Sequence, residues 1–179
     1  MSISPIAQRQ ESALKEFDAQ LKITLRHAQE SDLSALEWWG WHRAHREIIR
    51  SVFEQTLCGE SLMIVAESSG FPIGQAWVDL KKGRDTGTGM LWAVRVIPGF
   101  QGAGIGSRLI EAAEKALAEL GYTTSEIGVE EDNESARRLY EALAYRNIGK
   151  RRERREYVDP EGRAQCLTTD EWIFQKALV

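Results

Sequence analysis

Four glycines lie within eight residues of this chain, at positions 99, 102, 104 and 106 of the segment VRVIPGFQGAGIGSRLI, residues 94–110. Glycine loses more conformational freedom on folding than any other residue, so such a cluster indicates that another group approaches the backbone closely. The segment runs from an alternating apolar pattern into a helical one, and the N–H groups at the start of a helix attract anions. The pattern therefore predicts phosphate binding by the backbone.

Three kinds of glycine loop bind phosphate groups, and the sequence discriminates among them. A nucleotide P-loop needs a lysine followed by serine or threonine, which this segment lacks. A dinucleotide fingerprint has nearly the spacing of Gly102, Gly104 and Ser107, but it follows its strand directly and opens a series of parallel units. Here residues 98–100 intervene and an antiparallel meander precedes the loop, which disfavours a dinucleotide.

The third kind of loop fits more of the chain. Residues 101–106 (QGAGIG) resemble the Q/R-x-x-G-x-G/A pyrophosphate loop of the GNAT superfamily of N-acetyltransferases. Residues 96–106 are similar to the fourth strand and loop of that family, residues 133–145 (NESARRLYEALAY) to its next helical motif, and residues 23–33 to its opening strand and helix. The resemblance implies an N-acetyltransferase domain over residues 23–179, preceded by an N-terminal extension over residues 1–22.

The resemblance also implies a cosubstrate, acetyl-CoA, and no metal. In the family the fourth and fifth strands splay apart, and the pantetheine arm pairs with exposed backbone groups of the fourth strand. The pyrophosphate lies on the glycine loop. The residues implied to contact acetyl-CoA are Val94, Arg95, Val96, Gln101, Gly102, Ala103, Gly104, Ile105, Gly106, Ser107 and Asn133.

By the same resemblance an amine acceptor attacks the thioester directly, and a backbone N–H near Val96 stabilises the oxyanion that forms. Tyr140 occupies the family's tyrosine position, where its phenol would protonate the departing thiolate. A tyrosine on an apolar helix face can also be only a core residue, and Asn133 can be only a helix cap.

The general base has no obvious candidate in the sequence. Trp92 and Gly128 occupy the positions where family members often carry an acidic residue. Enzymes that acetylate ribosomal-protein N-termini have a glutamate at the position of Gly128, which disfavours that activity here. Asp79, Glu130 or a chain of water molecules remain as alternative bases.

Two classes of function follow. The first is an acetyl-CoA-dependent N-acetyltransferase acting on a primary amine, and the acidic pI of about 5.5 favours a cationic small molecule over a peptide N-terminus or a lysine. The second is a non-catalytic acyl-CoA-binding sensor or regulatory module. The missing family carboxylate supports the second class, whereas the retained Tyr140 supports the first.

The elements that must position these residues alternate along the chain. Strands are expected at residues 22–28, in two segments of 61–80 joined by a turn at Ser69 and Gly70, and at 90–97 and 125–131. Asp32 is expected to cap a first helix and a second helix to cover residues 41–57. Residues 105–120 form a helix that Gly121 ends, and residues 136–143 form a helix capped by Asp132 or Asn133. Two long strands joined by a turn at 159–162 follow.

The expected fold class is therefore α/β (α+β), a mixed, mostly antiparallel sheet of about seven strands flanked by helices and splayed between the fourth and fifth strands. With 179 residues, 42% hydrophobic and 28% charged, the chain has the composition of one globular domain. No apolar run is long enough to cross a bilayer and the N-terminus lacks the apolar centre of a secretion signal, so we expect a cytoplasmic protein with no membrane partner.

Other features point away from nucleic acids and metals. The net charge of −4 disfavours nucleic acid, and the basic residues 150–157 are interpreted as a solvated strand face. Cys58, Cys166 and the three histidines have no zinc-ligand spacing, and His42 and His45 are expected at the surface. Three tryptophans at positions 38, 39 and 41 cannot all face one core, so at least one is expected in an acceptor pocket, in packing or in a homodimer contact.

Overall fold

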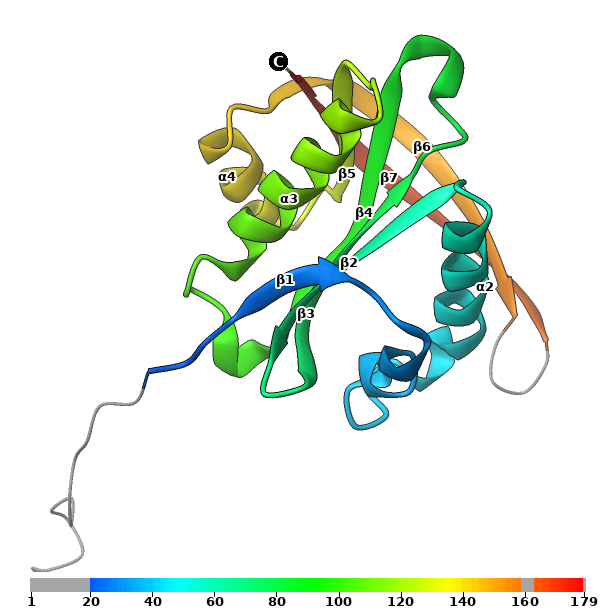
Figure 1. The fold of residues 1–179 in the computed structure, drawn as a ribbon. Helices are drawn as coiled ribbons and strands as arrows, with labels where there is room; N and C mark the ends of the chain where they lie inside the picture. Colours follow the sequence, from blue (N-terminus) through cyan, green and yellow to red (C-terminus); the bar gives the residue numbers. More distant parts are fainter. Residues whose placement is uncertain (1–19, 159–162, 179) are drawn as a thin grey trace, which may run out of the picture.

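Seven strands form one mixed sheet in the computed structural model, which describes residues 20–158 and 163–178 (Figure 1). Across the sheet the order is β1–β2–β3–β4–β5–β7–β6; β4 and β5 are parallel and the other neighbours are antiparallel. This confirms the predicted fold class. The predicted turn at 159–162 and residues 1–19 of the predicted extension lie outside the described residues. The strands are β1 (Thr24–His27), β2 (Ser61–Ser68), β3 (Phe71–Asp79), β4 (Thr88–Val96), β5 (Thr124–Glu130), β6 (Arg146–Val158) and β7 (Ala164–Ala177).

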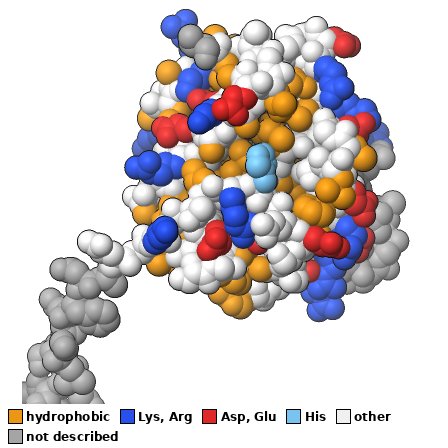
Figure 2. Space-filling model, viewed as in Figure 1, with side chains coloured by type: hydrophobic (Ala, Val, Ile, Leu, Met, Phe, Trp, Pro, Cys, Tyr) orange, Lys and Arg blue, Asp and Glu red, His pale blue; other side chains and the backbone are white. Residues whose placement is uncertain are grey.

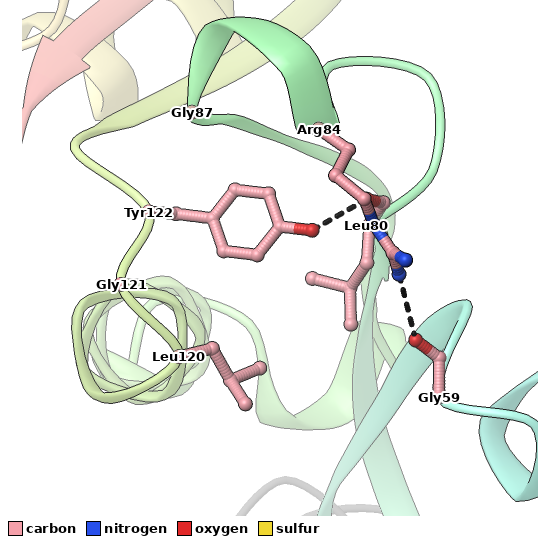
Figure 3. Close-up of a pocket in the computed structure, with 7 residues that line it drawn as sticks. All are labelled: Gly59, Leu80, Arg84, Gly87, Leu120, Gly121 and Tyr122. Atoms are coloured by element: carbon pink, nitrogen blue, oxygen red, sulfur yellow. Dashed lines mark hydrogen bonds between the residues drawn. The ribbon is translucent and has the colours of Figure 1, made fainter.

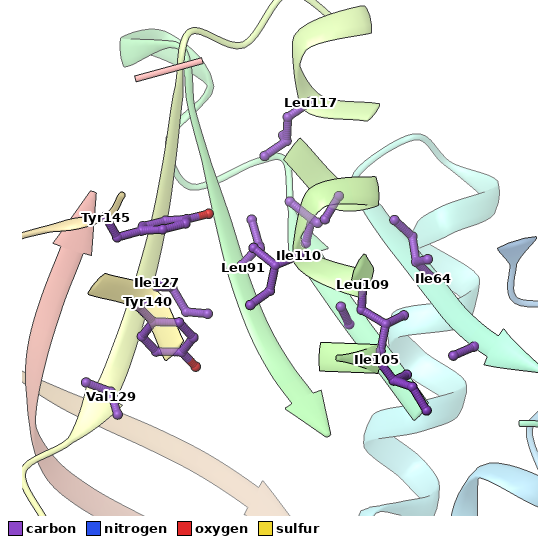
Figure 4. Packing of buried hydrophobic residues seen from close by; sticks show 14 of the residues in the cluster. Ile64, Leu91, Ile105, Leu109, Ile110, Leu117, Ile127, Val129, Tyr140 and Tyr145 are labelled. Atoms are coloured by element: carbon purple, nitrogen blue, oxygen red, sulfur yellow. The ribbon is translucent and has the colours of Figure 1, made fainter. Parts of the chain in front are cut away.

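Helices cover both faces of the sheet. Helices α3 (Ile105–Glu119) and α4 (Glu134–Ala142) lie on one side, which we call the α3 face, and α2 (Arg46–Leu57) lies on the other, the α2 face (Figure 1). The apolar spacing on α3 places Ile105, Leu109 and Leu117 in the buried cluster of the α3 face (Figure 4). The cluster of the α2 face includes Met63 and Trp77. Side chains of each central strand alternate between the two faces.

The strands β4 and β5 separate along their length. Their parallel register ends at the pair Leu91–Ile127, although β4 continues to residue 96 and β5 to residue 130. Ala93, with φ of 50°, marks a β-bulge where the register between β3 and β4 shifts. A bulge bends a strand and increases its twist. The predicted splay between the fourth and fifth strands is thus confirmed.

The helix expected after Asp32 is not formed; short 3₁₀ turns at Glu30–Asp32 and Ala35–Glu37 take its place. The buried carboxylate of Asp32 accepts hydrogen bonds from Gln29 N–H (2.7 Å) and from the Arg26 guanidinium (2.7 and 2.9 Å). Burial opposes ionisation of Asp32, but these hydrogen bonds and the charge of Arg26 hold its pKa below its usual value. Asp32 therefore links the 3₁₀ turn at Glu30–Asp32 to Arg26 of β1 through hydrogen bonds, and it does not cap an α-helix.

The second helix begins at Arg46, five residues later than predicted. Trp38, Trp39 and Gly40 have φ angles of 43°, 58° and 89°. Consecutive residues in this left-handed region cannot continue a right-handed helix. The chain therefore reaches α2 through a 3₁₀ turn at residues 43–45, and the expected start at Trp41 is wrong.

Helix α4 ends in a Schellman motif in which alanine takes the usual place of glycine. The N–H of Tyr145 donates to Tyr140 O (3.0 Å), the N–H of Ala144 donates to Glu141 O (3.0 Å), and Ala144 has φ of 66°. A left-handed conformation costs a residue with a Cβ roughly 1–2 kcal/mol.

Because of that cost, Ala144→Gly is expected to raise the free energy of unfolding by about 0.5 kcal/mol, after the extra freedom of glycine in the unfolded chain is subtracted. Urea denaturation measures the change. Ala142→Gly, two residues earlier and inside α4, is the matched control and should lower stability by about 1 kcal/mol. A lower urea midpoint for Ala144→Gly would contradict the assignment.

The surface seen in the direction of Figure 1 mixes both signs of charge. Figure 2 shows hydrophobic side chains gathered near the centre of this face, with lysine, arginine, aspartate and glutamate side chains interspersed around them. This distribution agrees with a modest net charge of −4 for the whole chain.

Candidate functional site

The glycine loop leads from the end of β4 into the first turn of α3. Gly102 and Gly104 have φ angles of 80° and 75°, and Gly104 is the residue directly before α3. A Cβ built on Gly99, Gly102 or Gly104 would meet no atom within 4 Å, so the space in front of the loop is open. The first N–H groups of a helix lack partners within it and carry positive partial charge, and the first turn of α3 has no acidic residue. The loop therefore fits a phosphate group.

The loop is held against the splayed part of β4. The side-chain amide of Gln101 donates to Val96 O (2.9 Å), and Ile105, 3% exposed, anchors the start of α3 in the core. Residues 101–107 thus lie beside the end of the strand that carries Val94, Arg95 and Val96. The structure brings together the loop and strand residues that the sequence predicts to contact acetyl-CoA.

Tyr140 lies on α4 in the cluster of the α3 face and is 6% exposed. Its ring contacts those of Tyr145 and Phe174, each with centroids 6.1 Å away, and its hydroxyl points toward β4 in Figure 4. Burial raises the pKa of Tyr140 to about 12, and the charge of Glu171 contributes to the rise. The phenol therefore keeps its proton at neutral pH, as a general acid requires.

Asn133 is the residue before α4. Its side-chain oxygen accepts a hydrogen bond from Ala136 N–H (3.0 Å), which satisfies one of the free N–H groups at the helix start. Of the two predicted caps, Asp132 and Asn133, the structure selects Asn133. A contact between Asn133 and acetyl-CoA stays a prediction.

Comparison with known proteins assigns the family. A family model described as the acetyltransferase (GNAT) family matches residues 23–145, well over half of the chain. The chain belongs to this family.

Solved structures show the same fold. An N-acetyltransferase from Staphylococcus aureus Mu50 matches with 18% identity and a TM-score of 0.70, over 88% of this chain and 99% of that one. The ribosomal-protein-S18-alanine N-acetyltransferase from Escherichia coli matches with 22% identity and a TM-score of 0.65, over 88% and 94% of the two chains. An N-acetyltransferase from Thermoplasma acidophilum in complex with coenzyme A matches with 15% identity and a TM-score of 0.65, over 87% and 99%.

On the α2 face, this acetyltransferase gathers aromatic and basic side chains near the splay. Trp92 packs edge-on against Trp77, with ring centroids 4.8 Å apart, and both indole N–H groups are buried without a hydrogen-bond partner in the described part of the chain. His42 and His45 are half-buried, contrary to the expected surface position. Burial and the charge of Arg95 lower the pKa of both histidines. Unpaired donors and neutral imidazoles therefore lie on the side of the sheet opposite α3.

The three neighbouring tryptophans lie in different environments and do not all face one core, as predicted. Trp38 is 2% exposed, and its indole N–H donates to Pro72 O (2.8 Å). Trp39 and Trp41 are 70% and 61% exposed, and Trp39 stacks on Phe71 with centroids 5.2 Å apart. Trp38 is therefore a packing residue of this acetyltransferase.

The carboxylates that sequence reasoning singled out are poorly placed for base chemistry. Asp79 accepts hydrogen bonds from Lys81 and Lys82 N–H (2.8 and 3.0 Å) and pairs in register with Met90, at the other end of β4 from the loop. Glu130 is exposed at the end of β5.

A third carboxylate, Glu171 on β7, is not among the candidates that the sequence offers. It is 4% exposed, and sequence alone does not separate it from its neighbour Asp170, which is exposed on the same strand. Strand alternation would place the two on opposite faces, but which face is buried depends on the partners of β7.

A pocket of about 320 Å³ lies away from these residues (Figure 3). It is formed around Leu120 and Gly121 at the far end of α3, where Tyr122 OH donates to Leu80 O (2.5 Å) and Arg84 donates to Gly59 O (3.3 Å). Since α3 has 15 residues, this pocket is about 22 Å from the glycine loop. Its polar groups bond to one another, and it carries no part of the candidate site.

Residues 20–158 and 163–178 offer neither a metal site nor a membrane-spanning helix. These residues contain no group of three histidine, cysteine, aspartate or glutamate side chains that could hold a metal ion. No helix among them is long and apolar enough to cross a membrane.

Proposed function

We propose that this acetyltransferase transfers the acetyl group of acetyl-CoA to a primary amine by direct attack, with residues 23–179 as the catalytic domain. The open glycine loop at the start of α3, next to the splayed β4, carries the proposal. Structural neighbours that bind acetyl-CoA or coenzyme A support it.

Residues of this chain fit the cosubstrate in two places. The backbone of residues 101–107 would hold the pyrophosphate, and the backbone of Val94, Arg95 and Val96 would hold the pantetheine arm. Acetyl-CoA supplies the thioester whose C–S bond breaks as the amide bond forms. A backbone N–H near Val96 would stabilise negative charge on the acyl oxygen.

Tyr140 would deliver its phenolic proton to the thiolate. Its high pKa keeps that proton in place at neutral pH, so the proton is available when negative charge develops on the sulfur. Asn133 would contribute mainly by fixing the start of α4, so that Tyr140 is held toward the splay.

The acceptor would approach from the α2 face, because α3 and α4 cover the other face. The aromatic ring of Trp92 and the net charge of −4 favour a cationic small amine over a peptide N-terminus or a lysine side chain.

A panel of amines with acetyl-CoA tests the proposal. Thiol release that depends on the added amine, together with mass-spectrometric detection of the N-acetylated product, is expected for at least one small cationic amine. Tight CoA binding without amine-dependent release from any acceptor would instead indicate a non-catalytic acyl-CoA-binding module.

Ligand binding should also stabilise the fold selectively. CoA or acetyl-CoA at a hundredfold excess over its dissociation constant adds about 2.7 kcal/mol to the free energy of unfolding, which for this chain length raises Tm by roughly 5–10 °C. NAD and ATP at the same concentration should leave Tm within about 1 °C, because the chain lacks the P-loop lysine and the dinucleotide context. Differential scanning fluorimetry measures the shifts, and a rise with NAD but not with CoA would contradict the loop assignment.

A further inference from the structure

Glu171 is a buried carboxylate in the middle of a long strand. It is 4% exposed on β7, between β5 and β6, where Glu130 and Arg151 are its register partners. The hydroxyl of Thr169 donates to Glu171 Oε1 (3.2 Å). Burying a charged group is costly unless it is paired or hydrogen-bonded, and this hydrogen bond is one of the interactions that offset the cost.

Gly128 provides the space that the carboxylate fills. A Cβ built on Gly128 would overlap Glu171 Oε2 and lie 3.3 Å from Glu171 Cδ. The carboxylate therefore occupies the place where a side chain of residue 128 would begin. Gly128 is the first residue of β5 beyond the last pair with β4, so this place lies at the mouth of the splay.

Glu171 and Tyr140 approach the splay from opposite faces. On β5 and β7, Val129 and Trp172 belong to the cluster of the α3 face, which also contains Tyr140. Strand alternation then places Gly128 and Glu171 on the α2 face. The two functional groups are near enough for the charge of Glu171 to contribute to the raised pKa of Tyr140. The phenol of Tyr140 and the carboxylate of Glu171 thus lie on opposite sides of the same gap.

We propose that the carboxylate of Glu171 is the catalytic base that takes a proton from the attacking amine. The inference rests on the proposed acetyl transfer and assigns the base that the sequence left open. It also explains the glycine at position 128, since any larger residue there would displace the carboxylate.

The protons balance with two groups of the chain. Glu171 accepts one proton from the substrate ammonium, which frees the nitrogen lone pair, and later releases that proton to water. Tyr140 gives its phenolic proton to the sulfur as the C–S bond breaks. The second proton lost by the nitrogen, as the C–N bond forms, restores the phenol. One ammonium ion and one thioester thus become one amide, one thiol and one released proton.

Charged and titratable groups from several elements surround Glu171. Arg151 faces it from β6, with its guanidinium 2.8 Å from Glu126 Oε1 of β5, and Gln175 of β7 donates to Glu126 Oε2 (2.8 Å). Glu130 pairs with Glu171 from β5, and Tyr140 approaches from α4. Burial raises the pKa of Tyr140 to about 12, so the phenol keeps its proton across the neutral range.

The main test is Glu171→Gln, which keeps the size of the side chain and removes its basicity. With the best amine, kcat/KM should fall by about a hundredfold at pH 7, while CoA affinity and Tm stay near those of the wild type. The loss should shrink to about tenfold or less near pH 9.5, because more of the amine is then already deprotonated in solution. A loss that is equal at every pH would overturn the base assignment.

Asp170→Asn is the matched control. It makes the same change of charge one residue earlier on β7, at an exposed side chain that pairs with Arg152 (2.8 Å). It should leave kcat/KM within about twofold of the wild-type value. If Glu130→Gln, and not Glu171→Gln, produced the hundredfold loss, the base would be Glu130 and the proposal would be wrong.

A measurement without ligand checks the geometry. In protein labelled with ¹³C at tyrosine Cζ, Glu171→Gln should move the ionisation of Tyr140 to lower pH, because a negative charge beside the phenol is removed, and Asp170→Asn should not. An unchanged Tyr140 resonance would mean that the two groups are too far apart to share one gap.

Relocating the carboxylate gives a second variant. Gly128→Glu combined with Glu171→Ala moves the acidic group from β7 to β5 at the same place. The kcat/KM of this double variant should be at least tenfold higher than that of Glu171→Ala alone. No recovery in a folded double variant would count against the assignment.

The failure of the proposed function and the failure of the base assignment are distinguishable. If the wild-type enzyme itself acetylated no amine, the proposed function would fail and the base with it. Wild-type activity that survives Glu171→Gln unchanged would refute only the base.

Discussion

Tyr140→Phe is expected to lower turnover by about ten- to a hundredfold with little change in CoA affinity. General acid catalysis typically contributes about a hundredfold or more, and the lower range applies here because a thiolate is already a fairly good leaving group. The ring remains in the cluster with Tyr145 and Phe174, so packing is kept. The proton is needed mainly in the transition state, so kcat should fall and KM should change little.

The high pKa of Tyr140 adds a pH criterion. Because burial and the charge of Glu171 raise it to about 12, the phenol stays protonated up to about pH 11. Wild-type kcat should therefore not fall between pH 8 and pH 10 through ionisation of the acid. A decline in that range that Tyr140→Phe removes would mean that the phenol is less shielded than its burial indicates.

Tyr145→Phe is the matched control for this prediction. Tyr145 is also buried, at 3% exposure, but its hydroxyl lies 2.6 Å from Ser125 Oγ and is occupied by that hydrogen bond. Its removal should cost about 1 kcal/mol of stability and leave kcat within about twofold. Single-turnover kinetics under conditions where chemistry limits the rate separate the two variants. Equal turnover in Tyr140→Phe and the wild type would make Tyr140 a core residue and leave the acid unassigned.

The sequence was informative where local chemistry determines the structure. Gly104 has φ of 75° directly before α3, a conformation that glycine adopts without the steric cost of a Cβ, and the glycine pattern of the sequence indicates such a turn. The α3 spacing and the Gly121 stop follow from the helical repeat, and the structure confirms both. The site residues that rest on these local features could therefore be named without a structure.

Sequence reasoning failed where a distant contact overrides local preference. The segment around Trp38 has a helical pattern, but the hydrogen bond from its indole to Pro72 O fixes a left-handed turn instead. No local pattern reveals that bond, because its partner lies 34 residues away in the chain. The start of α2 was consequently misplaced.

The candidate base was missed for the same reason. The glycine at position 128 indicates that β5 lacks the carboxylate that family members often carry there. Only the register of β5 with β7 reveals that Glu171 fills the space next to Gly128. Recognising this shared space requires the register of β5 with β7, in which Glu171 pairs with Glu130 and Gly128 with Ile173, and periodicity cannot supply that register.

Gly104→Val is expected to weaken CoA binding by about ten- to a hundredfold, equivalent to roughly 1.4–2.7 kcal/mol. The space next to Gly104 contains no protein atom within 4 Å, so the added side chain would not clash in the free protein. It would instead occupy the space through which phosphate oxygens reach the first N–H groups of α3. A β-branched residue at φ of 75° is also strained, so some loss of stability is expected. Isothermal titration calorimetry with CoA measures the affinity.

Strain alone could also weaken binding, and Gly121→Val separates the two causes. Gly121 lies at the other end of α3 with φ of 85° and likewise has no atom within 4 Å of a built Cβ. The same substitution therefore imposes a comparable backbone strain about 22 Å from the loop. Both variants should lose similar stability in urea, but only Gly104→Val should lose affinity for CoA. If the two variants bound CoA equally well, or lost affinity equally, the phosphate would not lie against Gly104 and the start of α3 would not be its binding site.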